Sequence, residues 1–182
     1  YNEPLATSNI EEGLIPFGKA RILQQGSDIT IVSYGIGIKH ALQAIPIAEK
    51  EGISIELIDL RSLRPLDYES VFTSVKKTNR CITIEECFPV CSIGNHLSAS
   101  IMENVFDYLD APVINLSGKD VPMPYAKNLE KEALVTIDEI LSAIDDLQNL
   151  KKEKKIDAIV INKPVPKNRS DDIPLNTLKL IE

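Results

Sequence analysis

Four short apolar runs, separated by segments of helical periodicity, constrain the fold of this chain most. The runs are rich in β-branched residues and lie at residues 28–34, 53–60, 81–84 and 113–116. Helical spacing of apolar residues marks residues 35–51, 67–78, 92–106 and 137–150. Strands that alternate with helices form an open, mostly parallel sheet with helices on both faces. The sequence therefore predicts a three-layer α/β domain over residues 17–150.

A further run at residues 19–24 precedes the first of these strands. The turn Gln25-Gly26-Ser27 between the two runs favours a β-hairpin. This run would then be the one antiparallel strand, at or near an edge of the sheet. Residues 1–16 are polar and aperiodic, with Pro4, Gly13 and Pro16, and are predicted to be an interdomain linker.

Local signals define the helices more closely. Pro46 lies inside the segment 35–51 and predicts a kink or a late helix start, and Gly52 predicts its end. Asp67 is the expected N-cap of the next helix. The apolar face of the segment 35–51 is expected to comprise Ala41, Leu42, Ile45 and Ala48.

Residues 151–182 are predicted to be a C-terminal extension that is partly irregular. A charged run precedes the apolar residues 156–161, which are interpreted as an added strand. Pro164, Pro166 and Pro174 follow among polar residues and favour an arm or a tail.

Composition narrows the possible partners. The net charge of −7 argues against a nucleic-acid partner, because an acidic surface repels phosphate backbones. No apolar run approaches the roughly 20 residues that span a bilayer, so we expect no membrane partner. The odd number of cysteines, 3, argues against a disulfide scaffold and for a reducing compartment.

Two groups of residues are candidates for chemistry. Gly35-Ile36-Gly37 lies between a strand and a helix, where phosphate can bind, but His40 stands where a dinucleotide fingerprint needs a third glycine. A tight strand-to-helix turn is the plainer interpretation. His40, early in its helix, is interpreted as exposed or hydrogen-bonded.

The second group is Glu85, Glu86, Cys87, Cys91 and His96. Its Cys-x3-Cys spacing is a weak zinc signal, and buried thiols near a loop explain it more simply. The two carboxylates are adjacent on a strand and point to opposite faces, so at most one serves a site. Solvated or helix-capping carboxylates are the favoured interpretation. The residues alone assign no catalytic, cofactor-binding or metal-binding residue.

Several motifs carry a family resemblance. Residues 58–67, Ile-Asp-Leu-Arg-Ser-Leu-Arg-Pro-Leu-Asp, resemble the signature of the C-terminal domain of transketolase-like enzymes. Residues 109–112, Leu-Asp-Ala-Pro, and residues 118–130, Gly-Lys-Asp-Val-Pro-Met-Pro-Tyr-Ala-Lys-Asn-Leu-Glu, resemble the beta subunit of the decarboxylating component of pyruvate dehydrogenase. The resemblance covers about residues 12–148.

The resemblance implies a function for a larger assembly. Such enzymes use thiamine diphosphate and magnesium to decarboxylate pyruvate oxidatively toward acetyl-CoA. In the family, the alpha subunit and the N-terminal domain of the beta subunit hold the cofactor, so no catalytic residue is transferred and no cofactor is expected on this domain alone. The implied partners are the alpha subunit, a second beta subunit and the dihydrolipoyl acetyltransferase component. The implied compartment is bacterial cytoplasm, mitochondrial matrix or plastid.

The resemblance also selects one site residue. Asp110 matches a family position near the surface that docks the acetyltransferase, whereas a turn carboxylate before Ala111-Pro112 is the plain alternative. Arg61 and Arg64 are interpreted as fastening a loop through charge-assisted bonds. The chain departs from the family's usual residues at Cys87, Ser92, His96 and Asn115. Two alternatives stay open: a beta subunit for a related 2-oxoacid, and a stand-alone interaction module without catalysis.

Overall fold

The computed structural model describes residues 16–161, with side chains described through residue 150. The elements run in chain order as β1 (Arg21–Gln24), β2 (Ile29–Ser33), α1 (Ile36–Lys50), β3 (Ile55–Asp59), α2 (Tyr68–Thr78), β4 (Cys81–Ile84), α3 (Ile93–Val105), the 3-10 turn η1 (Phe106–Tyr108), β5 (Ile114–Leu116), α4 (Lys127–Ala133) and α5 (Ile137–Ile161). Strands and helices alternate as predicted.

The sheet has the strand order β1-β3-β2-β4-β5. Strands β2 to β5 are mutually parallel, and β1 is antiparallel to β3 at the edge. The predicted antiparallel edge strand is thus confirmed, but the predicted hairpin is wrong, because β3 lies between β1 and β2. At the turn, the chain passes so close to β3 that a Cβ atom on Gly26 would lie 2.2 Å from the carbonyl carbon of Ile55.

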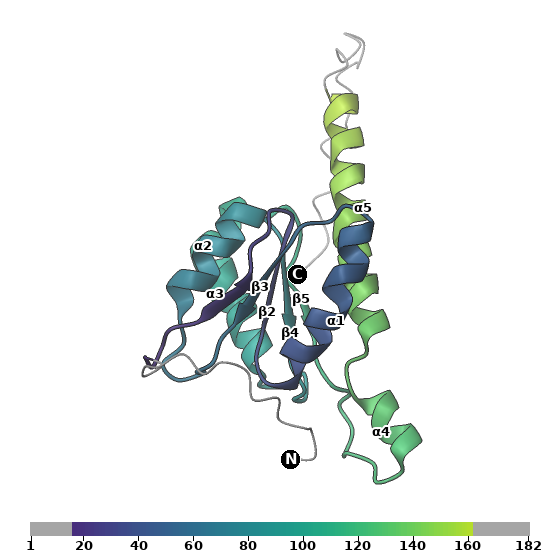
Figure 1. Ribbon diagram of the computed structural model, residues 1–182. Helices are drawn as coiled ribbons and strands as arrows, with labels where there is room; N and C mark the ends of the chain where they lie inside the picture. Colours follow the sequence, from purple (N-terminus) through teal and green to yellow (C-terminus); the bar gives the residue numbers. More distant parts are fainter. Residues whose placement is uncertain (1–15, 162–182) are drawn as a thin grey trace, which may run out of the picture.

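Two hydrophobic cores lie on opposite faces of this sheet. Helices α1 and α5 cover one face, and α2 and α3 cover the other (Figure 1). Ile29, Ile31 and Ile55 point into the first core, whereas Val32 and Ile58 point into the second. Strands that are buried on both faces explain the continuous apolar runs. The predicted three-layer α/β fold is confirmed.

Helix α1 differs from its predicted face at one position. Ala41, Ile45 and Ala48 are buried, but Leu42 is 47% exposed and lies outside the core. Ala44 is buried in its place. Pro46 lies within the helix, which continues to Lys50 before Gly52 adopts a positive φ of 81°.

The predicted N-cap of α2 is confirmed. The carboxylate of Asp67 accepts hydrogen bonds from the backbone N–H of Ser70 and, across 47 residues, from that of Ala20 at 2.9 Å. Burial opposes ionisation of Asp67, but these two N–H groups and the Ser70 hydroxyl outweigh it and lower the pKa below its usual value of 3.8. One side chain therefore joins the start of α2 to the segment that leads into β1.

We expect Asp67→Asn to lower the free energy of unfolding by about 1 kcal/mol at neutral pH. Because the pKa of Asp67 is depressed in the folded state, its ionised form stabilises the fold above the unfolded pKa near 3.8 and loses this contribution as the pH falls through the folded pKa. Urea unfolding of both proteins as a function of pH measures the difference. A gap that stays constant down to acid pH would show that the charge of Asp67 does not contribute.

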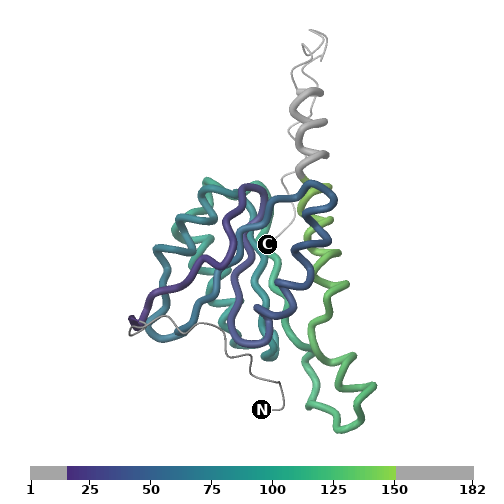
Figure 2. The backbone as a smooth tube through the Cα atoms, viewed as in Figure 1, coloured from purple at the N-terminus to yellow at the C-terminus, as the bar shows by residue number. Residues whose placement is uncertain are grey.

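The C-terminal part departs from the prediction in two ways. Helix α5 continues without interruption to Ile161, so the predicted added strand at residues 156–161 is wrong. A short helix, α4, was not predicted, and Figure 2 shows that it and its preceding loop extend away from the sheet. Among the described residues, no helix is long and apolar enough to cross a membrane. The predicted tail beyond residue 161 and the linker at residues 1–15 lie outside the described residues.

Candidate docking surface

Glu85 directly follows β4 at the carboxyl edge of the sheet, where α/β folds commonly place their chemistry. Its side chain is buried and accepts hydrogen bonds from the backbone N–H of Gly94 at 2.9 Å and the hydroxyl of Tyr34 at 3.1 Å. The neighbouring Glu86 is exposed. Glu85 therefore caps the N-terminus of α3, which confirms the helix-capping interpretation.

The same contacts affect Tyr34. Burial and the adjacent Glu85 carboxylate both raise the pKa of the Tyr34 phenol well above its usual value. The protonated Tyr34 phenol donates to the buried Glu85 carboxylate and so joins the segment after β2 to the loop after β4. Glu85 is buried and supports α3, whereas Glu86 is exposed, so the two adjacent carboxylates do not form an acid–base pair.

The positions at which the sequence is expected to depart from the family gather around the start of α3. Asn115 on β5 accepts a hydrogen bond from Thr83 at 2.7 Å and donates to Asn95 at 3.0 Å, and Ser92 caps α3 through the backbone N–H of Asn95. His96, one turn further along α3, contacts the hydroxyl of Tyr68 through its Nε2 atom. These side chains tie β4, β5, α2 and α3 together.

The thiols in this region have ordinary structural surroundings. Full burial raises the pKa of Cys81 to about 12. Partial desolvation of the sulfur and, after it, the contact with Glu85 raise the pKa of Cys87. Cys87 and Cys91 are exposed, not buried as the plainer interpretation of them held. Within residues 16–150, no group of three or more Cys, His, Asp or Glu side chains has the proximity to hold a metal ion.

The remaining sequence candidates have simple structural roles. Gly35 takes a positive φ of 58° at the N-cap of α1, and a Cβ atom on Gly37 would lie 2.3 Å from the hydroxyl oxygen of Ser33. Both glycines therefore make a tight strand-to-helix turn. His40 is half-buried in α1. Arg61 and Arg64 are exposed, and neither side chain makes the expected charge-assisted bond within the part of the chain that the structure describes.

Asp110 lies at the opposite, amino-terminal edge of the sheet, before β5. Its backbone N–H donates to the carbonyl of Asn79 at 2.9 Å, and its carboxylate contacts the guanidinium of Arg80 at 2.8 Å. The Arg80 side chain is 3% exposed and also donates to the carbonyl of Asp28 at 3.3 Å, whereas the Asp110 side chain is 49% exposed. A buried arginine thus fixes the orientation of a half-exposed carboxylate.

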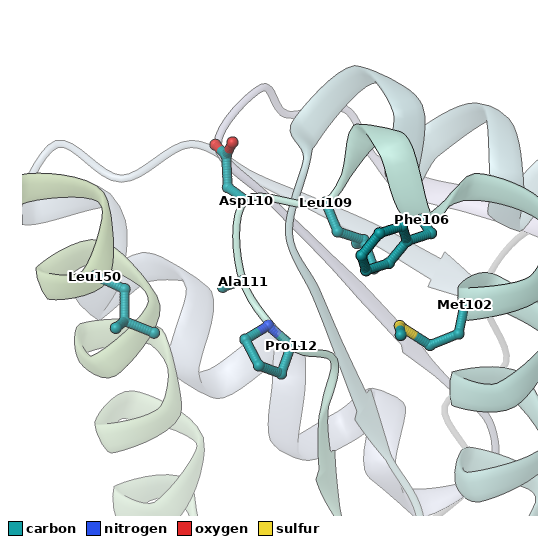
Figure 3. Close-up of a pocket in the computed structure, with 7 residues that line it drawn as sticks. All are labelled: Met102, Phe106, Leu109, Asp110, Ala111, Pro112 and Leu150. Carbon is teal, nitrogen blue, oxygen red and sulfur yellow. The ribbon is translucent and has the colours of Figure 1, made fainter. Parts of the chain in front are cut away.

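An apolar pocket of about 310 Å³ lies directly beside Asp110 (Figure 3). Met102 and Phe106 line one side, and Leu150 of α5 lines the other, with Ala111 and Pro112 between them. Phe106 is 60% exposed and Met102 is 47% exposed. No sequence pattern indicated this pocket, because one wall comes from residues 102–112 and the other from Leu150, which is distant in the chain. A charged rim beside an apolar hollow is a composition typical of docking sites.

Further exposed apolar side chains belong to α4 and to the loop before it, a segment that extends below the sheet in Figure 1. Its large side chains are Val121, Met123, Tyr125 and Leu129, all at least 46% exposed. Clustered apolar side chains of this size mark surfaces that contact other proteins. These residues belong to the run 118–130 that carries the resemblance to beta subunits.

The transketolase C-terminal domain family matches residues 18–140. The chain therefore belongs to this family of domains. Among solved structures, a chain described as a split-gene transketolase in an inactive beta4 tetramer superposes with a TM-score of 0.66 at 27% identity, over 77% of this chain and 44% of that chain. The fold and the sequence thus agree on the class of domain.

More specific relatives are beta subunits of the pyruvate dehydrogenase E1 component. The subunit from Rhizobium meliloti is 46% identical over 144 residues, which are 79% of this chain and 31% of the relative. The mitochondrial beta-2 subunit from Oryza sativa is 52% identical over 129 residues, which are 71% of this chain and 34% of the relative. The chain spans about a third of the length of these relatives. The resemblance to a pyruvate dehydrogenase beta subunit, stated from the sequence motifs, is confirmed.

Proposed function

We propose that this chain is the domain through which a pyruvate dehydrogenase beta subunit assembles and docks the dihydrolipoyl acetyltransferase component. The identity of 46–52% to E1 beta subunits over the folded body supports this most strongly. In the full enzyme, thiamine diphosphate and magnesium would support oxidative decarboxylation of pyruvate toward acetyl-CoA. The alpha subunit and a second beta subunit complete the assembly.

Assembly has physical support in the apolar surface around α4. Val121, Met123 and Tyr125 lose contact with water when a second subunit covers them, and burial of apolar area drives association. We assign this surface to subunit packing. Asp110 and its pocket lie at the other edge of the sheet, so packing and docking use separate surfaces.

Docking has support in the geometry of Asp110. Arg80 holds the carboxylate at the rim of the apolar pocket, so a partner with a basic group beside an aliphatic side chain meets a preorganised surface. The alternative role, a turn carboxylate, also has support, because the Asp110 N–H bonds to Asn79. A binding measurement on the assembled enzyme separates the two roles.

We propose that thiamine diphosphate is held by the other parts of the full enzyme and not by this domain. The buried carboxylate at the carboxyl edge, Glu85, is already engaged by Gly94 and Tyr34. No catalytic step is therefore assigned to this chain.

We expect the 182-residue chain to show no decarboxylation of pyruvate and no binding of thiamine diphosphate with magnesium at micromolar concentrations. Isothermal titration calorimetry measures the binding. Saturable heat with a micromolar Kd would contradict the proposed division of labour between domains.

Two other functions remain as candidates. A beta subunit for a related 2-oxoacid would give an assembled tetramer with higher kcat/KM on a branched-chain oxoacid than on pyruvate. A stand-alone module would bind the acetyltransferase component without any alpha subunit. Assays of both properties with the alpha subunit present and absent distinguish these candidates from the proposed function. The proposed compartment is the bacterial cytoplasm or the mitochondrial matrix, because the relatives are bacterial and mitochondrial proteins.

A further inference from the structure

We propose that the C-terminal segment of this chain, residues 173–181, is the occupant of the apolar pocket beside Asp110. The segment reads Ile-Pro-Leu-Asn-Thr-Leu-Lys-Leu-Ile and follows Pro164 and Pro166 of the extension. Its aliphatic side chains match a pocket lined by Met102, Phe106 and Leu150.

The path of the chain favours an occupant from the same molecule. Leu150 forms one wall of the pocket, and α5 carries the chain onward from that wall to Ile161 (Figure 3). Those 11 residues advance about 16 Å at 1.5 Å per residue. The 11 residues from Asn162 to Asp172 can span up to about 36 Å when extended, which exceeds the roughly 16 Å that α5 advances beyond Leu150.

Tethering also raises the local concentration of the segment. A connection of this length holds a tethered ligand at roughly millimolar effective concentration, so a modest intrinsic affinity fills the pocket. A second copy or a free partner must reach a comparable concentration to compete. Lys179, between Leu178 and Leu180, adds a cation that complements the carboxylate at the pocket rim.

Occupancy of the pocket would regulate docking. A segment that covers the apolar hollow beside Asp110 competes with any partner that uses the same surface, so displacement of the segment would precede binding. This consequence rests on the proposed function, whereas occupancy itself does not.

The two methionines of the sequence provide the test. Met102 lines the pocket, and Met123 lies on the distant surface around α4, so the two methyl groups act as probe and internal control. The 182-residue chain is labelled with carbon-13 at the methionine methyl groups and observed by NMR. We expect the double substitution Leu175→Asp with Leu178→Asp to shift the Met102 resonance and to leave the Met123 resonance in place.

A matched variant controls for charge. Asn176→Asp with Thr177→Asp adds the same two negative charges to the same segment and is expected to leave Met102 unshifted. A synthetic peptide of residues 162–182 should restore the original Met102 resonance when it is added to the doubly substituted Leu175, Leu178 chain.

Three results would overturn the inference. They are an unchanged Met102 resonance in the Leu175, Leu178 variant, an equal shift in the matched variant, and a Met102 resonance that depends on protein concentration, which would identify a second copy as the occupant. None of them involves the acetyltransferase component, so the failure of this inference is distinguishable from the failure of the proposed docking.

Discussion

We expect Glu85→Ala to lower the free energy of unfolding by about 3 kcal/mol. The substitution leaves the buried N–H of Gly94 and the Tyr34 hydroxyl without their acceptor, and each unsatisfied group costs about 1–3 kcal/mol. The substitution also removes the free-energy cost of burying a carboxylate, and this offsets part of the loss. The start of α3 keeps its Ser92 cap but loses the acceptor of the Gly94 N–H.

The neighbouring Glu86 provides the control. Glu86 is exposed, so Glu86→Ala is expected to change the free energy of unfolding by no more than about 0.5 kcal/mol. Urea denaturation followed by circular dichroism measures both variants. Equal effects at the two positions, or a Glu85→Ala protein as stable as the original, would show that Glu85 does not support α3.

The second large effect is expected at Gly26. A Cβ atom in Gly26→Ala would lie 2.2 Å from the carbonyl carbon of Ile55 and 2.4 Å from the nitrogen of Glu56, both of which are backbone atoms of β3. The backbone of an interior strand cannot move aside cheaply, so we expect a loss of about 3 kcal/mol or more. Thermal unfolding should show a decrease in Tm of roughly 6–12 °C.

Gly52→Ala separates steric overlap from backbone strain. Gly52 has a φ of 81°, but a Cβ atom there would have no neighbouring atom within 4 Å, so alanine costs only the strain of a left-handed backbone, about 1–2 kcal/mol. A smaller loss at Gly26 than at Gly52 would contradict the close passage of the turn against β3, and with it the observed strand order.

The alternation of strands and helices made the layers of the fold predictable, because buried parallel strands require continuous apolar runs. The neighbours of β1 were not predictable from local sequence. The turn at Gly26 has the composition of a hairpin, yet β1 pairs with β3, which lies beyond β2 and α1 in the chain. Residues 156–161 have the composition of a strand, but α5 continues through them.

The candidate site was predictable only in part. The resemblance identified Asp110, and its position in a Leu-Asp-Ala-Pro turn is visible in the sequence. The sequence does not reveal that Arg80 holds this carboxylate, because the two residues precede different strands and meet only where β4 and β5 lie side by side. The pocket wall at Leu150 depends in the same way on the packing of α5 against the sheet.

The proposed role of this domain is to dock the acetyltransferase component and to take no part in the decarboxylation itself. Asp110→Asn in the assembled alpha–beta enzyme tests this role through two activities measured on one preparation. The first is pyruvate-dependent reduction of an artificial electron acceptor, which needs no docking, and the second is formation of acetyl-CoA with the acetyltransferase component present.

We expect the acceptor activity of Asp110→Asn to equal that of the unsubstituted enzyme. We expect the acetyltransferase concentration for half-maximal acetyl-CoA formation to rise at low salt, by about fivefold if Asp110 forms an exposed pair worth about 1 kcal/mol and by more if the pair is desolvated. An unchanged half-maximal concentration, or an equal loss of both activities, would contradict the assignment of Asp110 to the docking surface.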